Sequence, residues 1–259
     1  GEQTAFLAAT AGSTGAARRV AWRQHEFLRE VRAMSHWLQL RPGDRALSIM
    51  SLAHYGERML AQKSMLMHEA LLHLPENGAT VFNDMSEVEP HFLFAAPRLF
   101  EKLQGMTELF MQEAVHVARS AYASCLSARS PGWLQRRTRE RIRSALGLKN
   151  VRVALAGGAS SPAQVADWFG AIGVPLLDCY GMAEAGFCRI APASPSMETA
   201  SAPIETGTQL KLAPDGEVLV RGAIARPGYW VRGTLGAAEI LADGWLRTGD
   251  LGRVGGHGR

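Results

Sequence analysis

The chain has 259 residues, of which 47% are hydrophobic and 20% are charged, and its formal net charge is +4. These values are typical of a globular protein with one large domain, or with one and a half smaller ones. No apolar run approaches the roughly 18 residues of a membrane-spanning helix, and no signal peptide is visible at the N-terminus.

The first part of the chain reads as alternating strands and helices. Residues 6–9 are a short apolar strand candidate, and the small, hydroxyl-rich residues 10–19 form a loop after it. Residues 23–40 carry apolar side chains spaced four, three and four apart, which predicts an amphipathic helix. Residues 59–73 are helical in composition, and residues 79–82 read as a strand.

The middle of the chain continues this alternation. Residues 92–96 read as a buried strand closed by Pro97, and a helix of about twenty residues follows. Residues 133–146 form a basic helix, and residues 151–156 are a β-branched, apolar strand. The apolar run at 174–177 reads as another short buried strand.

From about residue 200 the pattern changes to strand, turn and strand. Residues 208–212 and 217–221 flank Ala-Pro-Asp-Gly, which predicts a hairpin because proline presets φ and glycine accepts a positive one. We therefore predict an α/β protein. Residues 1–200 would form a layered α/β subdomain of mixed sheets and helices, and residues 201–259 a smaller β-rich subdomain, a distorted barrel.

The cysteines and histidines limit the kinds of disulfide and metal site that the chain can be expected to have. Cys125, Cys179 and Cys188 form no CxxC pair. They argue against a disulfide framework or a structural zinc site, and they predict a reducing, cytoplasmic location. The histidines show no ligand spacing with carboxylates or cysteines, so a histidine metal site is not expected.

Two stretches of small residues are candidates for binding a nucleotide. Residues 10–18 resemble a phosphate-binding loop, because small residues let backbone N–H groups converge on an anion and a cation follows them. They do not match GxxxxGK[ST], and an ordinary Gly/Ser/Thr loop remains an alternative. Residues 157–159, Gly-Gly-Ala, follow a buried strand, where ligands of open α/β sheets bind. A tight strand–helix turn explains these glycines equally well.

Two carboxylates leave strand-like segments on glycine-containing turns. Glu184 lies between Gly181 and Gly186 in the stretch 178–186, which follows the apolar run at 174–177. A carboxylate in such a place usually serves a cation, a hydrogen-bond network or a substrate. Asp250 follows a Thr-Gly pair and could accept both hydroxyls of a ribose, with a solvated loop aspartate as the alternative.

The order and spacing of these motifs resemble the acyl-adenylate-forming superfamily, which comprises acyl-CoA synthetases, luciferases and nonribosomal adenylation domains. Gly-Glu-Val-Leu-Val-Arg-Gly at 216–222 and Gly-Tyr-Trp at 228–230 add to this resemblance. Residues 52–58, Leu-Ala-His-Tyr-Gly-Glu-Arg, and 96–103, Ala-Pro-Arg-Leu-Phe-Glu-Lys-Leu, look more narrowly like the long-chain fatty acyl-CoA synthetase branch. The resemblance covers essentially the whole chain.

The resemblance implies a site for ATP, Mg²⁺, CoA and a fatty acid. The residues expected to hold the β- and γ-phosphates are Thr10, Gly12, Ser13, Thr14, Gly15 and Arg18. Those expected around the adenine are Gly157, Gly158, Ala159, Tyr180, which would stack on it, and Gly181. Asp250 would accept the ribose hydroxyls.

The same resemblance implies a catalytic set of Glu184, Arg18 and His54. Glu184 would coordinate Mg²⁺, a hard cation that typically takes one or two carboxylates. His54 would lie at the wall between the acyl and nucleotide pockets. The fatty carboxylate would attack the α-phosphorus to give acyl-AMP and pyrophosphate, and thiolysis by CoA would follow. The protein would contribute mainly positioning and charge stabilisation.

Three departures from the family pattern bear on activity. The position after Met182 is usually threonine and is Ala183 here, and the usual Pro-Lys of the loop is Ala17-Arg18. The family's mobile C-terminal domain, with its adenylation lysine, would lie beyond Arg259. We therefore expect residues 1–259 to bind nucleotide and to adenylate poorly. The alternative is a non-catalytic nucleotide- or acyl-binding relative.

The basic helix at 133–146 has three interpretations: a nucleic-acid patch, a membrane-surface patch or a solvated helix face. We expect a solvated face and no nucleic-acid partner. Long-chain substrates partition into membranes, so peripheral attachment at a membrane stays open.

Overall fold

A computed structural model of the chain describes residues 3–10, 18–60, 65–128, 130–194, 207–222, 228–231, 234–236 and 240–253. The strands are β1 (Thr4–Ala9), β2 (Arg19–Arg23), β3 (Arg45–Leu47), β4 (Leu71–His73), β5 (Phe92–Ala95), β6 (Val153–Gly157), β7 (Leu176–Met182), β8 (Gly186–Pro192), β9 (Gln209–Leu212), β10 (Glu217–Arg221), β11 (Gly228–Val231), β12 (Thr234–Gly236) and β13 (Leu246–Leu251). The helices are α1 (Gln24–Leu38), α2 (Tyr55–Glu57), α3 (Met65–Met67), α4 (Val81–Val88), α5 (Pro97–Glu113), α6 (His116–Ser127), α7 (Trp133–Ala145) and α8 (Ala163–Ala171).

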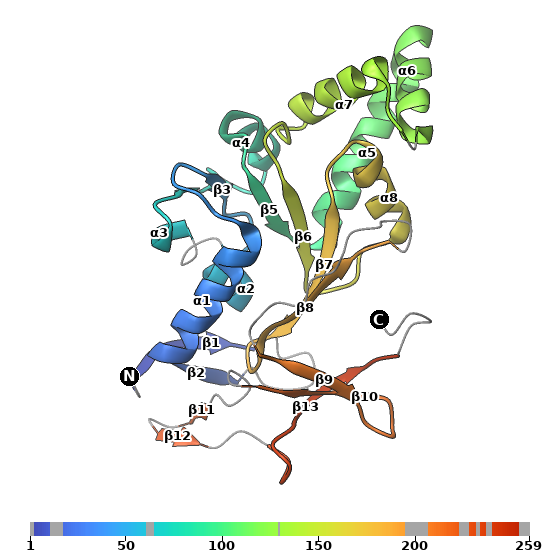
Figure 1. Cartoon of the computed structure of the whole chain (residues 1–259). Coiled ribbons are helices and arrows are strands. Elements are labelled where there is room, and N and C mark those ends of the chain that lie inside the picture. Colours follow the sequence, from blue (N-terminus) through green and yellow to red (C-terminus); the bar gives the residue numbers. More distant parts are fainter. Residues whose placement is uncertain are drawn as a thin grey trace.

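The sheet β5-β6-β7-β8 lies at the centre, with three parallel strands and an antiparallel fourth, β8. Strands β5 and β6 are continuous apolar runs because both faces of the sheet are covered there. Figure 1 shows α1 on one side of this sheet and α5 and α8 on the other. Phe94 and Leu155 belong to the core cluster shared with α1, whereas Leu93 and Ala154 belong to the cluster shared with α5 and α8. The predicted strands at 92–96 and 151–156 are thus confirmed.

The helices mostly follow the predicted pattern. The helix expected at 23–40 is α1, which ends where Gln39 adopts a left-handed conformation with φ 50°. The single helix expected after Pro97 is divided in two, because the extended Ala114 ends α5 and the extended Val115 precedes α6. The helices α5, α6 and α7 extend from the sheet at the end opposite β9, β10 and β13 (Figure 1). No helix in the described parts of the chain is both long and apolar enough to cross a bilayer.

Two predicted elements were wrong. Residues 79–82 were expected as a strand, but helix α4 begins at Val81, where the Thr80 hydroxyl donates to Asp84 in the first turn. Residues 59–73 were expected to be helical throughout, but 71–73 form strand β4, parallel to β3. In both cases a tertiary contact overrides a local preference: Val81 packs into the core, and the Leu71 N–H donates to the Asp44 carbonyl.

The C-terminal part of the chain contributes to two sheets. The hairpin predicted around 213–216 is confirmed, since β9 and β10 pair antiparallel and β13 adds to the other edge of β10. Strands β11 and β12 instead join β1 and β2, so that this sheet contains strands from both ends of the chain. The described strands after residue 207 lie in separate sheets. The distorted barrel and the division at residue 200 stay predictions.

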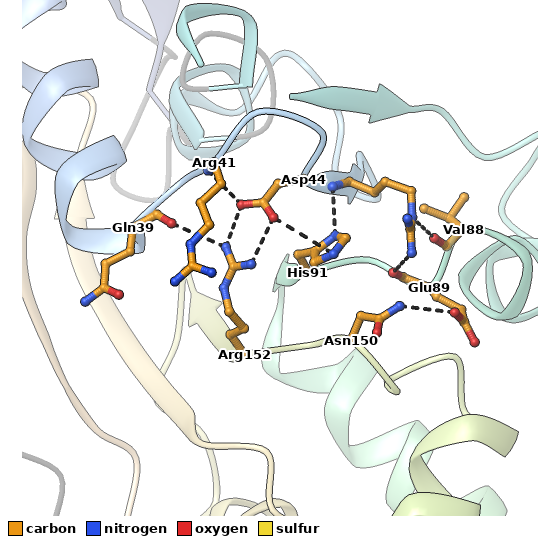
Figure 2. Close-up of polar contacts among 9 residues, drawn as sticks. Gln39, Arg41, Asp44, Val88, Glu89, His91, Asn150 and Arg152 are labelled. Carbon is orange, nitrogen blue, oxygen red and sulfur yellow. Dashed lines mark hydrogen bonds and ion pairs between the residues drawn. The ribbon is translucent and has the colours of Figure 1, made fainter. Parts of the chain in front are cut away.

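A partly buried polar network around the buried Asp44 connects β3 with the beginnings of β5 and β6 (Figure 2). The Asp44 carboxylate accepts hydrogen bonds at 2.6 and 2.9 Å from the Arg152 guanidinium and at 2.9 Å from the Arg41 N–H. Burial alone would raise the pKa of Asp44, but these hydrogen bonds hold it below its usual value. His91 Nδ1 accepts from the Arg45 N–H, and the Arg45 guanidinium donates to carbonyls at the end of α4.

Candidate nucleotide site

The base of the small-residue loop is closed by the pairing of β1 with β2. The Thr10 N–H donates to the Arg18 carbonyl at 2.9 Å, and the Arg18 N–H donates to the Thr10 hydroxyl at 3.0 Å. Gly12, Ser13, Thr14 and Gly15 lie outside the described residues, so their expected phosphate contacts stay predictions. The loop therefore connects the two strands of one hairpin, and Arg18 lies at its end.

Glu184 lies in the tight turn between β7 and β8, and only 8% of its surface is exposed. Its carboxylate Oε1 accepts a hydrogen bond from the Tyr229 hydroxyl at 3.2 Å. The Arg18 guanidinium lies 5.1 Å from the centroid of the Tyr229 ring, within the range of a cation–π contact. Burial raises the pKa of Glu184, while the Tyr229 hydroxyl and the Arg18 charge oppose this rise. A nearby cation would thus favour the ionised carboxylate.

Tyr180 and Asp250 form a second pair beside this cluster. The Tyr180 hydroxyl donates to Asp250 Oδ2 at 2.8 Å, although the two residues are 70 positions apart in the chain. Burial and the Asp250 carboxylate raise the pKa of Tyr180 above its usual value, so its hydroxyl stays neutral and keeps its proton. Asp250 is exposed on β13, and a carboxylate has further acceptor positions beyond this one bond.

The glycines after β6 have a packing role of their own. A Cβ at Gly157 would lie 2.8 Å from the Phe94 ring, and a Cβ at Gly56 would also lie 2.8 Å from that ring. Gly158 has φ +86°, and both Gly158 and Ala159 are exposed. Because Gly157 pairs with Cys179, the backbone after it continues alongside Tyr180. Their contact with adenine stays a prediction.

His54 and Gly181 have different surroundings. His54 directly precedes α2 and is exposed, whereas the next residue, Tyr55, is buried against Trp22 and Phe187. The expected position of His54 between two pockets therefore stays a prediction. A Cβ at Gly181 would lie 2.5 Å from the Gly186 carbonyl oxygen, so glycine is needed there for the close approach of β7 and β8.

Sequence reasoning missed three side chains near Glu184. Tyr229 lies in the Gly-Tyr-Trp motif that was noted without a role, and it is the hydrogen-bond donor to Glu184. Trp22 belongs to none of the motifs, but its indole N–H donates to the Ala183 carbonyl at 2.9 Å. Glu30 of α1 accepts from the Phe187 N–H. Only Tyr229 had a sequence signal, the motif around it.

Magnesium is the metal that the family resemblance implies. In the described parts of the chain, no group of three or more His, Cys, Asp or Glu side chains could hold a metal ion. Mg²⁺ keeps several waters and is commonly held by one or two carboxylates together with substrate phosphates. The buried acidic position of Glu184 beside Arg18 and Tyr229 fits that use, as a protein ligand to a cation that arrives with the nucleotide.

The chain matches known proteins over most of its length. Residues 1–230 match the family model described as AMP-binding enzyme. The chain is 29% identical to a Mycobacterium tuberculosis protein named as a fatty-acid–CoA ligase, fadD11, across 96% of this chain and 48% of that protein. It is 26% identical to the long-chain-fatty-acid–CoA ligase FadD15 of Mycobacterium bovis, across 96% of this chain and 44% of that one. It thus spans about half the length of the curated relatives that it matches.

Solved structures share the fold. ATP-bound MatB from Rhodopseudomonas palustris superimposes with a TM-score of 0.69 at 18% identity, over 99% of this chain and 47% of that one. The N-terminal domain of FACL13 from Mycobacterium tuberculosis gives a TM-score of 0.67 at 17% identity, over 100% and 59%. With the family match over residues 1–230, this chain belongs to the AMP-binding, or adenylate-forming, enzyme family.

Proposed function

We propose that the protein takes part in ATP-dependent activation of a fatty acid, first to acyl-AMP and then to acyl-CoA. The supporting observation is the convergence of Arg18, Tyr180, Glu184, Tyr229 and Asp250 from separate parts of the chain of an AMP-binding family member. The similarity to fatty-acid–CoA ligases supports a fatty acid as the acyl substrate.

The proposed chemistry uses these side chains for charge and position. A fatty carboxylate oxygen attacks the α-phosphorus of ATP, and the bond to the bridging oxygen breaks as pyrophosphate leaves. The thiolate of CoA then attacks the acyl carbonyl, and AMP leaves. Arg18 opposes phosphate charge, and Asp250, which already accepts from the Tyr180 hydroxyl, takes the ribose hydroxyls. Glu184 would hold Mg²⁺, which would neutralise charge on the phosphates.

Thermal denaturation with separate ligands tests the proposal. A ligand that binds only the folded state raises the melting temperature. We expect ATP with Mg²⁺ to raise it, and a long-chain fatty acid to raise it further in the presence of ATP. A non-catalytic acyl-binding relative would respond to the fatty acid alone, and a response to neither ligand would overturn the proposal.

Ala183 leads to a prediction about ATP affinity. Its side chain is 8% exposed and belongs to the core cluster that contains Trp22 and Tyr55. We expect Ala183→Thr to tighten ATP binding about tenfold or more, because a hydroxyl bond to a phosphate is worth roughly 1–3 kcal/mol. The added methyl and hydroxyl groups must also fit into the packed cluster, so the melting temperature should fall. Calorimetric titration with ATP and Mg²⁺ measures the first effect, and an unchanged affinity would contradict it.

Helix α7 is the basis for proposing peripheral membrane attachment. Arg143 serves the fold, since it donates to the carbonyls of Leu148 and Val151. Arg136 and Arg137 are exposed, and Trp133 at the start of the helix is 71% exposed. An exposed tryptophan beside arginines favours contact with an anionic bilayer surface. We expect Arg136→Glu with Arg137→Glu to reduce sedimentation with phosphatidylserine vesicles, whereas unchanged sedimentation rules out this role.

A further inference from the structure

Glu30 is an acidic side chain with no exposed surface, in the middle of helix α1. Its Oε1 accepts a hydrogen bond of 2.6 Å from the backbone N–H of Phe187, 157 residues later in the chain. Phe187 is the second residue of β8 and lies three residues after Glu184. A carboxyl group buried this deeply is unfavourable unless it has polar partners, and here the Phe187 N–H and the Tyr55 side chain supply them.

The backbone opposite Glu30 is shaped around this carboxyl group. Gly186 has φ +73°, a conformation that glycine adopts readily. A Cβ at this position would lie 2.8 Å from Glu30 Oε1 and 2.9 Å from Oε2. The carboxyl group therefore occupies the space of a missing side chain, and any other residue at 186 would displace it.

A second contact holds the other end of the same turn. The Trp22 indole N–H donates to the Ala183 carbonyl at 2.9 Å, and Trp22 is fully buried. Trp22 lies in β2 and Glu30 in α1, and these elements follow Arg18 directly. The residues on both sides of Glu184 are thus attached to the segment that begins at Arg18.

We propose that Glu30 is a positioning residue, whose hydrogen bond to Phe187 holds the turn at 183–187 so that Glu184 faces Arg18 and Tyr229. Trp22 supplies the second attachment, at Ala183. The part of this inference that concerns Mg²⁺ and ATP rests on the proposed function, whereas the part that concerns the turn does not.

Hydrogen exchange of the backbone amides tests the structural part. Glu30→Met keeps the length of the side chain and removes the acceptor, and Glu30→Gln keeps an acceptor oxygen. We expect exchange at Phe187 and in the turn to become at least about tenfold faster in Glu30→Met, because a buried N–H loses its partner. In Glu30→Gln it should stay within about threefold of the parent protein. Parent-like exchange in Glu30→Met would overturn the proposal.

Glu26 provides a matched control on the same helix, one turn earlier. It is 4% exposed and accepts from the Arg23 N–H at 3.0 Å, so it caps α1 and has no bond to β8. Glu26→Gln and Glu26→Met should change exchange in the first turn of α1 and leave residues 183–187 unchanged. If exchange in the turn becomes faster by the same factor in Glu26→Met and Glu30→Met, the helix is loosened in general. That result would also overturn the proposal.

Calorimetric titration of ATP, with Mg²⁺ or with EDTA, tests the link to Glu184. We expect Glu30→Met to reduce the gain in affinity that Mg²⁺ provides by about tenfold, with Glu30→Gln restoring it and binding in EDTA unchanged. If exchange in the turn becomes faster in Glu30→Met while Mg²⁺ still raises ATP affinity by as much as in the parent protein, Glu30 does not position Glu184. If the parent protein binds no ATP, the proposed function fails, while the exchange experiment still decides the role of Glu30 in the turn.

Discussion

Replacing Glu184 by alanine should lower Mg²⁺-dependent ATP affinity about a hundredfold and leave affinity in EDTA almost unchanged. The carboxylate is the proposed protein ligand of the cation. Because this carboxylate is buried, its attraction for a positive ion is stronger than it would be in water. Alanine also leaves the Tyr229 hydroxyl without its acceptor. Calorimetric titration with and without Mg²⁺ measures the difference between the two affinities.

Glu184→Gln separates charge from shape in this experiment. Its amide oxygen can still accept from the Tyr229 hydroxyl, so the turn and the aromatic side chain should remain in place. We expect this variant to lose almost as much of the Mg²⁺ effect as the alanine variant, while its melting temperature stays near that of the parent protein. A glutamine variant with the full Mg²⁺ effect would exclude Glu184 as a metal ligand.

Replacing Arg152 by alanine should lower the free energy of unfolding by about 3 kcal/mol, because it leaves a buried carboxylate without its main partner. The side chain of Asp44 is 5% exposed, and Arg152 provides two of its hydrogen bonds (Figure 2). Because the pKa of Asp44 is lowered in the folded state, this contribution is present above its ordinary pKa and fades as the pH falls through the folded-state value. Urea denaturation at neutral pH measures the loss.

An exposed ion pair of the same chain is the control for this measurement. Lys211 and Asp243 lie 3.4 Å apart, with side chains 43% and 57% exposed. We expect Asp243→Asn to change the free energy of unfolding by less than about 1 kcal/mol, as is usual for surface pairs. Similar losses in the Arg152 and Asp243 variants would contradict the idea that burial makes the Asp44 pair important.

The elements that were predicted correctly have a strong local pattern, which is a helical spacing, a continuous apolar run or a turn sequence. The spacing within 23–40 predicted α1, and the apolar runs at 92–96 and 151–156 predicted β5 and β6. Strand β4 could not be found in this way, because its three residues become a strand only by pairing with β3. Helix α4 was missed because Ala-Thr-Val-Phe has strand-like composition and its helical turn depends on Thr80 and Asp84.

The residues of the candidate site also fall into two groups, those that the sequence could identify and those that it could not. Glu184, Tyr180 and Asp250 could be selected because each lies in a recognisable motif, and the structure brings Tyr180 and Asp250 into contact. Glu30 lies at an ordinary position of an amphipathic helix, and its importance depends on a backbone N–H far along the chain. Contacts of that kind have no local signature, since neither partner's type or spacing identifies the other.

The pairing of β2 with β11 makes assembly of this site a late event in folding. Ala21 lies opposite Gly228 and Val20 opposite Tyr229, across more than two hundred intervening residues. Contacts this distant in sequence form slowly, since a long loop must close before they contribute any stability. A shift of the pairing by one residue would turn Tyr229 to the opposite face of the sheet, away from Arg18 and Glu184. The Tyr229–Glu184 hydrogen bond is therefore a marker of the correctly registered, completely folded chain, and partly folded forms should lack it.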